Sequence, residues 1–253
     1  MNFFQAVFLG FIQGITEFLP VSSSGHLAIS QHFLGFKEAN LAFDTFLHFG
    51  TLLAVIIFFW KDLIKLKIKN WLIIAVGTIP AIFAGLLIKD YIENIITSTV
   101  IVAGFLIVTG IINLISDKKL EQERTTTNVS YKNSFIIGLF QAFAIIPGIS
   151  RSGSTLFGGL IQKLDRKEAF KFSFYLSIPA ILGATILQGL DVLEIGLNGI
   201  TPITYLVGAT TAFITGILSL RVFKYIIEKA RLEIFGWYCI TAGIILIIGS
   251  YFG

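Results

Sequence analysis

The chain has 253 residues and a formal net charge of +4, and 55% of its residues are hydrophobic while only 13% are charged. A soluble domain of ordinary composition has about 25% charged residues, so this chain carries more apolar surface than a water-soluble globule can bury. The composition excludes a nucleic-acid-binding role for the excess positive charge, and it predicts an all-α polytopic membrane protein.

The first apolar stretch, at about residues 2–34, is interrupted near its middle by proline, serine and glycine. A transmembrane helix needs about 20 apolar residues to cross roughly 30 Å of hydrocarbon, and each arm of this stretch is too short. Irregular backbone at membrane depth is tolerated only where protein or a water-filled cavity satisfies its polar groups. We therefore expect a re-entrant helix–loop–helix here, and another in a second interrupted stretch at about 134–161.

Six uninterrupted segments are long and apolar enough to span a membrane. They cover about residues 42–60, 71–88, 97–115, 170–188, 202–220 and 234–252. A hydrophilic linker at about 117–133 separates the third span from the second interrupted stretch. The expected fold is a single membrane domain, 1–253, with about six transmembrane helices and two re-entrant segments.

The basic residues indicate the orientation of these spans. Sixteen of the nineteen Lys and Arg residues, Arg124 among them, fall in loops on one side of the predicted membrane, and such loops are typical of the cytoplasmic side. Only Lys37 and Lys89 fall on the other side, where the loop between the fourth and fifth spans carries Asp191 and Glu194. Both chain termini are therefore predicted to lie outside the cytoplasm.

The two halves of the chain resemble each other. The polar positions Gly10, Gln13, Ser22, Ser24 and Gly25 recur at a constant offset as Gly138, Gln141, Ser150, Ser152 and Gly153. The charge pattern makes the first interrupted stretch enter from outside and the second from the cytoplasm. This predicts an inverted repeat, at about 1–116 and 134–253, with its site where the repeats meet near mid-membrane. Small-residue ladders at 77–85 and 208–216 are expected to pack closely against other helices.

The first interruption carries ionisable and hydroxyl side chains. Gln13 and Glu17 are four residues apart and share one helix face. Pro20 ends that arm, and the serines after it can cap the next arm. His26 follows Ser23 by three residues, which would bring imidazole and hydroxyl together if the second arm is helical.

The second interruption, at 147–155, places one fixed cation, Arg151, among small hydroxyl residues and glycine. A guanidinium fork beside the N–H groups of a helix start is suited to holding phosphate. Together the two interruptions supply the parts of a phosphoryl-transfer site: a carboxylate, an imidazole, hydroxyls and an arginine.

A structural interpretation is the alternative, because clusters of Ser and Gly in membrane helices are often packing devices. An ionisable residue inside the membrane indicates function instead, and Glu17 and Arg151 both satisfy that criterion. His48, near the outer end of the first span, is expected to be a structural or interfacial residue. Asp44 is left open between a structural and a functional role, and His32 is expected to have no chemical role.

Two long motifs closely resemble those of the undecaprenyl-pyrophosphate phosphatases of the bacitracin-resistance type. They are Gln13-x-x-x-Glu17 followed by Pro20-Val21-Ser22-Ser23-Ser24-Gly25-His26, and Pro147-Gly148-Ile149-Ser150-Arg151-Ser152-Gly153-Ser154-Thr155. The resemblance covers essentially the whole chain. It implies a hydrolase of the bacterial cytoplasmic membrane that removes the terminal phosphate of a polyprenyl pyrophosphate, so that the monophosphate carrier returns to peptidoglycan synthesis. It also implies a divalent cation, Mg²⁺ or Ca²⁺, and a membrane-lipid partner.

By matched position, the resemblance implies that Arg151 holds the pyrophosphate, that Glu17 and His26 supply acid–base or metal-linked functions, and that Ser23 is the nucleophile. Attack by water, assisted by Glu17 or His26, stays open beside attack by Ser23. Glu17 and Gln13 are the expected metal ligands, although an amide cannot act as a base. The residues expected to bind substrate phosphate are Gln13, Ser22, Ser24, Gly148, Ser150, Arg151, Ser152 and Thr155.

A lipid-phosphate flippase or secondary transporter is the main alternative, since inverted repeats with broken segments are typical of alternating access. The Ser-Arg-Ser sequence of the second motif favours a protein that binds and cleaves phosphate over one that only transports it. The sequence leaves open a homodimer and the preferred polyprenyl chain length.

Overall fold

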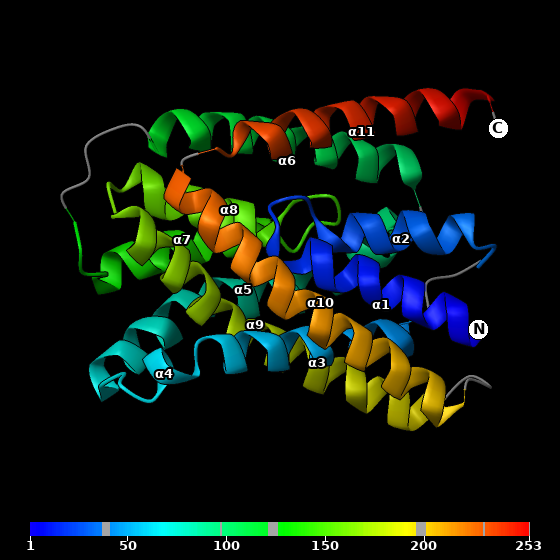
Figure 1. Cartoon of the computed structure of the whole chain (residues 1–253), viewed down its shortest axis with the longest axis horizontal. Coiled ribbons are helices and arrows are strands. Elements are labelled where there is room, and N and C mark those ends of the chain that lie inside the picture. Colours follow the sequence, from blue (N-terminus) through cyan, green and yellow to red (C-terminus); the bar gives the residue numbers. More distant parts are fainter. Residues whose placement is uncertain (37–40, 97, 121–125, 196–200, 230, 253) are drawn as a thin grey trace.

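The computed structural model describes residues 1–36, 41–96, 98–120, 126–195, 201–229 and 231–252. The described residues form helices and no β-sheet, so the all-α prediction is confirmed (Figure 1). The helices are α1 (Phe3–Phe18), α2 (Ser23–Phe33), α3 (Leu41–Phe58), α4 (Trp60–Leu63), α5 (Ile68–Ile96), α6 (Thr99–Leu120), α7 (Tyr131–Phe143), α8 (Arg151–Ile161), α9 (Arg166–Ile195), α10 (Pro202–Lys229) and α11 (Glu233–Phe252). Helical residues of α6 and α7 occupy both ends of the predicted linker.

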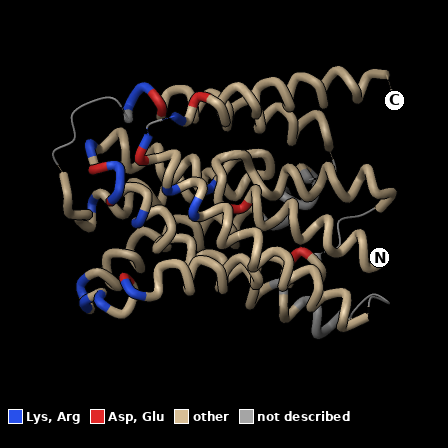
Figure 2. Tube along the Cα trace, in the orientation of Figure 1, with Lys and Arg blue, Asp and Glu red and all other residues tan. Residues whose placement is uncertain are grey.

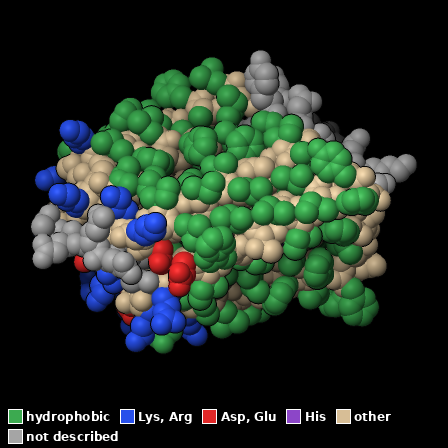
Figure 3. Space-filling view, turned by 90° about the horizontal axis from the view of Figure 1, so that it is seen from above, with side chains coloured by type: hydrophobic (Ala, Val, Ile, Leu, Met, Phe, Trp, Pro, Cys, Tyr) green, Lys and Arg blue, Asp and Glu red, His purple; other side chains and the backbone are tan. Residues whose placement is uncertain are grey.

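Five helices are long and apolar enough to cross a membrane, and the chain is a multi-pass membrane protein. These spans are Ile68–Ile88, Thr99–Lys119, Arg166–Leu187, Pro202–Lys229 and Glu233–Phe252. The remaining predicted span, 42–60, is a shorter apolar helix that ends at Phe58 and is followed by the short helix α4. Exposed hydrophobic side chains cover most of the face seen in Figure 3, and charged side chains gather at one end of it.

Each interrupted stretch forms a pair of short helices, α1–α2 and α7–α8, that turns back toward the end from which it came (Figure 1). In the first turn, Ser22 has a left-handed φ of 68°, and its Oγ accepts a hydrogen bond from the N–H of Gly25 at 3.4 Å. In the second, Gly148 has a φ of 94°, which glycine adopts without strain. Ser150 Oγ then accepts from the N–H of Gly153 at 3.1 Å. Both returning helices therefore begin with a serine cap, which the sequence predicted for the first of them.

The two helix pairs enter from opposite ends of the molecule (Figure 1). Figure 2 shows most Lys and Arg residues at the end where α7 begins, and the start of α1 and the end of α11 lie at the other end. The arrangement has the sense expected of inverted repeats, while the repeat boundaries, the depth in the bilayer and the cytoplasmic side stay predictions. Of the charged residues used for orientation, Lys37 and Arg124 lie outside the described residues, as do the side chains of Lys89, Asp191 and Glu194.

The small-residue ladders bring the two halves into close contact, as predicted. Helix α1 packs on α10 of the second half, and α7 packs on α5 of the first half. A Cβ atom on Gly10 would lie 2.5 Å from the carbonyl oxygen of Gly208, and one on Gly138 would lie 2.2 Å from that of Gly77. Backbones this close leave no room for a larger side chain, so each interrupted stretch is held against the other half.

Helix α6 fixes both loops. Asn113 Nδ2 donates to the carbonyl oxygen of Pro20 at 2.6 Å. Four residues earlier on the same face, Thr109 Oγ1 donates to the carbonyl oxygen of Gly148 at 2.8 Å and accepts from the N–H of Ser150 at 2.9 Å. Because backbone groups away from secondary structure need partners when buried, these side chains stabilise the two irregular turns side by side.

Candidate active site

A cavity of about 410 Å³ lies where the two loops meet. Its polar side is lined by Glu17, Ser23, Ser24, His48, Gln141, Ser150 and Arg151. Its other walls are mainly apolar and come from two membrane helices, α5 and α9. The lining residues are Thr78, Ala81, Ile82, Gly85 and Leu86 of α5 and Pro179, Ala180, Ile181, Gly183, Ala184 and Leu187 of α9. The cavity therefore joins ionisable groups from both halves to an apolar channel between two membrane helices.

The carboxylate of Glu17 is the centre of the polar side. Only 7% of Glu17 is exposed, and its Oε1 atom lies 2.5 Å from Arg151 Nη2. Its Oε2 atom accepts hydrogen bonds from Ser23 Oγ at 2.6 Å and from Gln13 Nε2 at 3.1 Å. A buried carboxylate is stable only when paired and hydrogen-bonded, and here α1, α2 and α8 all contribute partners. The structure thus brings together Glu17, Ser23 and Arg151, as predicted.

Arg151 is the first residue of α8 and reaches across the interface between the halves. While Nη2 pairs with Glu17, Nη1 is buried and has no hydrogen-bond partner among the described residues. Helices α2 and α8 both start at this cavity, with Ser23 and Arg151 as their first residues. Helix N-termini carry partial positive charge and attract anions. The unpaired guanidinium nitrogen and the two helix starts favour an anionic ligand.

His26 does not lie beside Ser23, contrary to the prediction. Its Nδ1 atom is 2.8 Å from the carbonyl oxygen of Ser22, and its Nε2 atom is 2.7 Å from the hydroxyl of Tyr238 on α11. The two rings are stacked, with centroids 5.7 Å apart. Ser23 turns toward Glu17 instead. Both ring nitrogens of His26 are thus engaged, Nδ1 at the start of its own helix and Nε2 in joining α2 to α11, and the residue is not part of the cavity lining.

His48 is the histidine that the structure places in the cavity, although the sequence suggested only a structural or interfacial role. Its Nε2 atom lies 3.8 Å from Glu17 Oε2, and 29% of its side chain is exposed. Its Nδ1 atom is 2.8 Å from the carbonyl oxygen of Asp44, so Nδ1 carries the proton and Nε2 faces the carboxylate. The criterion applied to Glu17 and Arg151, an ionisable residue within an apolar helix, would have identified it.

Asp44 lies behind His48 and outside the cavity lining. Its side-chain carboxylate accepts a hydrogen bond from Gln31 Nε2 at 2.7 Å. Its backbone carbonyl group orients the imidazole of His48. Asp44 therefore joins α3 to α2 and fixes the position of His48. His32, by contrast, is exposed at the end of α2 and contacts the ring of Phe33.

Of the residues expected to bind phosphate, Ser24, Ser150 and Arg151 line the cavity, whereas five others do not. Ser22 caps α2, and Gly148 forms the left-handed turn. Ser152 Oγ donates to the carbonyl oxygen of Leu19, and Thr155 joins α8 to Ser173 on α9. These polar groups satisfy backbone and neighbouring side chains, because a broken helix inside apolar surroundings needs partners of its own.

Gln13, the fifth, is completely buried behind Glu17, so of the two predicted metal ligands only Glu17 faces the cavity. The Oε1 atom of Gln13 has no partner among the described residues. Over the same part of the chain, no group of three or more His, Cys, Asp and Glu side chains comes together. A carboxylate oxygen is a ligand of the type that Mg²⁺ and Ca²⁺ prefer. The donor set therefore fits a cation only if phosphate oxygens and water supply most of its ligands.

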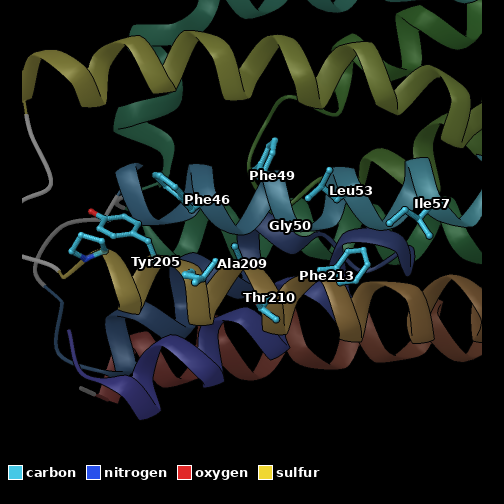
Figure 4. Close-up of a pocket in the computed structure, with 11 residues that line it drawn as sticks. Phe46, Phe49, Gly50, Leu53, Ile57, Tyr205, Ala209, Thr210 and Phe213 are labelled. Carbon is cyan, nitrogen blue, oxygen red and sulfur yellow. The ribbon is translucent and has the colours of Figure 1, made fainter.

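A second cavity, of about 510 Å³, lies between α3 and α10 (Figure 4). Its labelled side chains are mainly aromatic and aliphatic, such as Phe46, Phe49 and Leu53 from α3 and Phe213 from α10. The described residues that line it include no charged side chain and no histidine. It therefore lacks the groups that phosphate chemistry requires.

The fold and the cavity define a polytopic membrane protein whose two inverted helix pairs join a carboxylate, a serine and an arginine at one site. The family described as Bacitracin resistance protein BacA matches residues 6–245, and the chain belongs to that family. It is similar over nearly its whole length to three proteins named as undecaprenyl-diphosphatases.

The chain is 41% identical to the undecaprenyl-diphosphatase of Halothermothrix orenii, with 98% of each chain covered. It is 43% identical to undecaprenyl-diphosphatase 4 of Bacillus thuringiensis, with 99% of this chain and 98% of the other covered. It is 40% identical to the undecaprenyl-diphosphatase of Methanosphaera stadtmanae, with 99% of each covered.

Proposed function

We propose that the protein is an undecaprenyl-diphosphatase, which hydrolyses a polyprenyl pyrophosphate to the monophosphate lipid carrier and inorganic phosphate. This activity returns the carrier to peptidoglycan synthesis and confers resistance to bacitracin. Relatives that bear this name are similar to the chain over nearly their whole length. The observation that carries the proposal is the buried pair of Arg151 and Glu17, in which one guanidinium nitrogen has no hydrogen-bond partner within the described parts of the chain.

The shape of the cavity supports a substrate that is half lipid. Arg151 Nη1 and the starts of α2 and α8 suit the pyrophosphate. The apolar walls formed by α5 and α9 suit the polyprenyl chain, and lining side chains such as Ile82 and Leu187 are about half exposed, as in a cavity that is open to its surroundings. The head group would lie at the loops while the chain runs between these helices into the bilayer.

Ser23 is the proposed nucleophile, and Glu17 takes the place of His26 as its base. Ser23 Oγ already donates its proton to Glu17 Oε2 at 2.6 Å. In the reaction, Ser23 Oγ bonds to the terminal phosphorus, and the bond from that phosphorus to the bridging oxygen breaks. The electron pair leaves with the lipid monophosphate, which Arg151 stabilises. The proton of Ser23 moves to Glu17, and water then hydrolyses the phosphoserine.

His48 is proposed to support the base. Its Nε2 atom lies 3.8 Å from Glu17 Oε2, the same oxygen that accepts the bond from Ser23. A proton that reaches this oxygen can pass to His48 once substrate draws the groups together, because catalytic hydrogen bonds often tighten only in the complex. Asp44 holds the imidazole in the tautomer that this transfer needs.

A divalent cation, Mg²⁺ or Ca²⁺, remains part of the proposal. When bound by Glu17 and substrate oxygens, such an ion would neutralise phosphate charge. The protein is proposed to lie in the bacterial cytoplasmic membrane with its basic end in the cytoplasm and both termini outside. A homodimer is not required, because both motifs of the site come from one chain.

Trapping the covalent intermediate tests the nucleophile. The purified protein is given polyprenyl pyrophosphate labelled in its terminal phosphate, in wild-type form and as His48→Gln, which is expected to slow turnover. Label on Ser23 and loss of hydrolysis in Ser23→Ala would support a phosphoenzyme. Undiminished hydrolysis in Ser23→Ala would assign the attack to water instead.

A lipid-phosphate flippase is the second candidate, because the two helix pairs enter from opposite ends, as in alternating-access transporters. The two candidates differ in product. Reconstituted vesicles that move lipid phosphate across the bilayer without releasing inorganic phosphate would favour the flippase.

A further inference from the structure

Gln141 on α7 has a buried side-chain amide that finds no hydrogen-bond partner in the part of the chain that the structure describes. Only 2% of its surface is exposed, and both Nε2 and Oε1 are buried with no hydrogen-bond partner among the described residues. Exchanging the amide nitrogen and oxygen leaves the side chain equally unsatisfied, because neither atom has a partner there. An unsatisfied buried amide is costly and usually indicates a missing ligand or water. Gln141 lies in the wall of the cavity that contains Arg151.

The corresponding residue of the first half explains why the partner is missing. Gln13 donates to Glu17, four residues further along α1. In the second half, the residue four places after Gln141 is Ile145, which lines the same cavity. The second half has therefore kept the amide but lost the carboxylate that satisfied it. Within α7, no side chain at that spacing can take its place.

We propose that Gln141 is a substrate-binding residue, whose amide N–H donates to an oxygen of the pyrophosphate. This inference rests on the proposed function and names a contact within the same site. Among the described residues, two donors in the cavity wall lack partners, Arg151 Nη1 and the amide of Gln141. A pyrophosphate offers several acceptor oxygens within one small group, so it can satisfy both at once, whereas the polyprenyl chain can satisfy neither.

The test compares Gln141→Leu with wild type. Leucine has nearly the shape of glutamine but cannot donate. We expect the Kd for inorganic pyrophosphate, measured in detergent, to rise about 10-fold, with a similar rise in KM for polyprenyl pyrophosphate and a smaller change in kcat. The melting temperature without ligand should stay the same or rise, because the unsatisfied amide is gone. A glutamine with a structural role would give the opposite result, a lower melting temperature with unchanged Kd.

Two further variants sharpen the test. Thr185→Val removes another buried polar atom, Thr185 Oγ1, which has no partner among the residues that the structure describes and lies outside the cavity lining. This variant should leave Kd and KM unchanged. Gln141→Glu places a carboxylate beside the phosphates and should weaken pyrophosphate binding more than Gln141→Leu does. Normal or tighter binding by Gln141→Glu, or an unchanged Kd in Gln141→Leu, would overturn the proposal.

The pyrophosphate measurement also separates this inference from the function on which it rests. A wild-type protein that binds pyrophosphate through Gln141 but releases no phosphate from the lipid substrate would refute the hydrolase and keep the binding residue. A wild-type protein that is active, together with a Gln141→Leu variant that binds pyrophosphate equally well, would support the hydrolase and refute Gln141 as a binding residue.

Discussion

The loops after α1 and α7 have matching frameworks and different chemistry. Each breaks an apolar stretch, begins its returning helix with a serine cap, and is held by α6. At matching positions, however, the first loop has Ser23 where the second has Arg151, and α1 has Glu17 where the α7 loop has Ile145. Ser23 and Arg151 both reach the same carboxylate. The two loops therefore share a framework, and different residues at matching positions within it make an asymmetric site.

Glu17→Gln removes the charge that only the first half has kept. The amide retains the size of the side chain but cannot accept the proton of Ser23 or pair as an ion with Arg151. We expect kcat for phosphate release to fall about 10³-fold. Glu233→Gln, at the exposed start of α11, is the matched control and should keep wild-type activity. A Glu17→Gln variant with more than a tenth of the wild-type kcat would mean that the carboxylate is not the base.

His48→Gln and His26→Gln distinguish the histidine in the cavity from the one predicted by helix spacing. Loss of His48 should lower kcat about 10²-fold, because general acid–base groups contribute about that much or more. Added imidazole should partly restore activity to His48→Ala. His26→Gln should act mainly on stability, by loss of the contact with Tyr238.

His32→Gln, in an exposed position on the same helix as His26, is the control and should change neither kcat nor stability. If His26→Gln lowers kcat more than His48→Gln at equal stability, the assignment of the two histidines is reversed.

Gly10→Ala and Gly138→Ala test whether the two halves are equivalent as scaffolds. Each methyl group would meet a backbone carbonyl of the opposite half at 2.5 Å or less. Overpacking of this kind costs about 1–3 kcal/mol, and the two variants should lose similar amounts of stability in detergent unfolding. Gly104→Ala on α6, where a Cβ would meet nothing within 4 Å, should be neutral or stabilising. A large difference between Gly10→Ala and Gly138→Ala would show that the halves are not held together in the same way.

The sequence predicted the helices and the two charged residues at the centre of the site, because each of these follows from local rules. Span length, serine caps and the cost of an intramembrane charge are readable one segment at a time, and they led to α1–α2, α7–α8, Glu17 and Arg151. The errors concern side-chain direction. Helix spacing placed His26 near Ser23, but contact with Tyr238, more than two hundred residues away, turns the imidazole toward α11.

The same limit applies to the polar residues around the site. Ser152 and Thr155 belong to the motif, yet they bond to Leu19 and Ser173. Which hydroxyl satisfies the backbone and which faces the cavity depends on packing between distant helices. His48 reaches Glu17 only because α3 lies against α1, and no local pattern predicts that contact.

The central claim is that Arg151 of the second half and Glu17 of the first form one pyrophosphate-cleaving site. The direct test is release of inorganic phosphate from polyprenyl pyrophosphate by the purified protein with Mg²⁺ or Ca²⁺ supplied, for wild type, Arg151→Ala and Arg151→Lys. We expect turnover by wild type, a loss of about 10³-fold or more in Arg151→Ala, and only partial recovery in Arg151→Lys, because lysine cannot present a guanidinium fork. Equal activity in wild type and Arg151→Ala, or none in wild type, would contradict it.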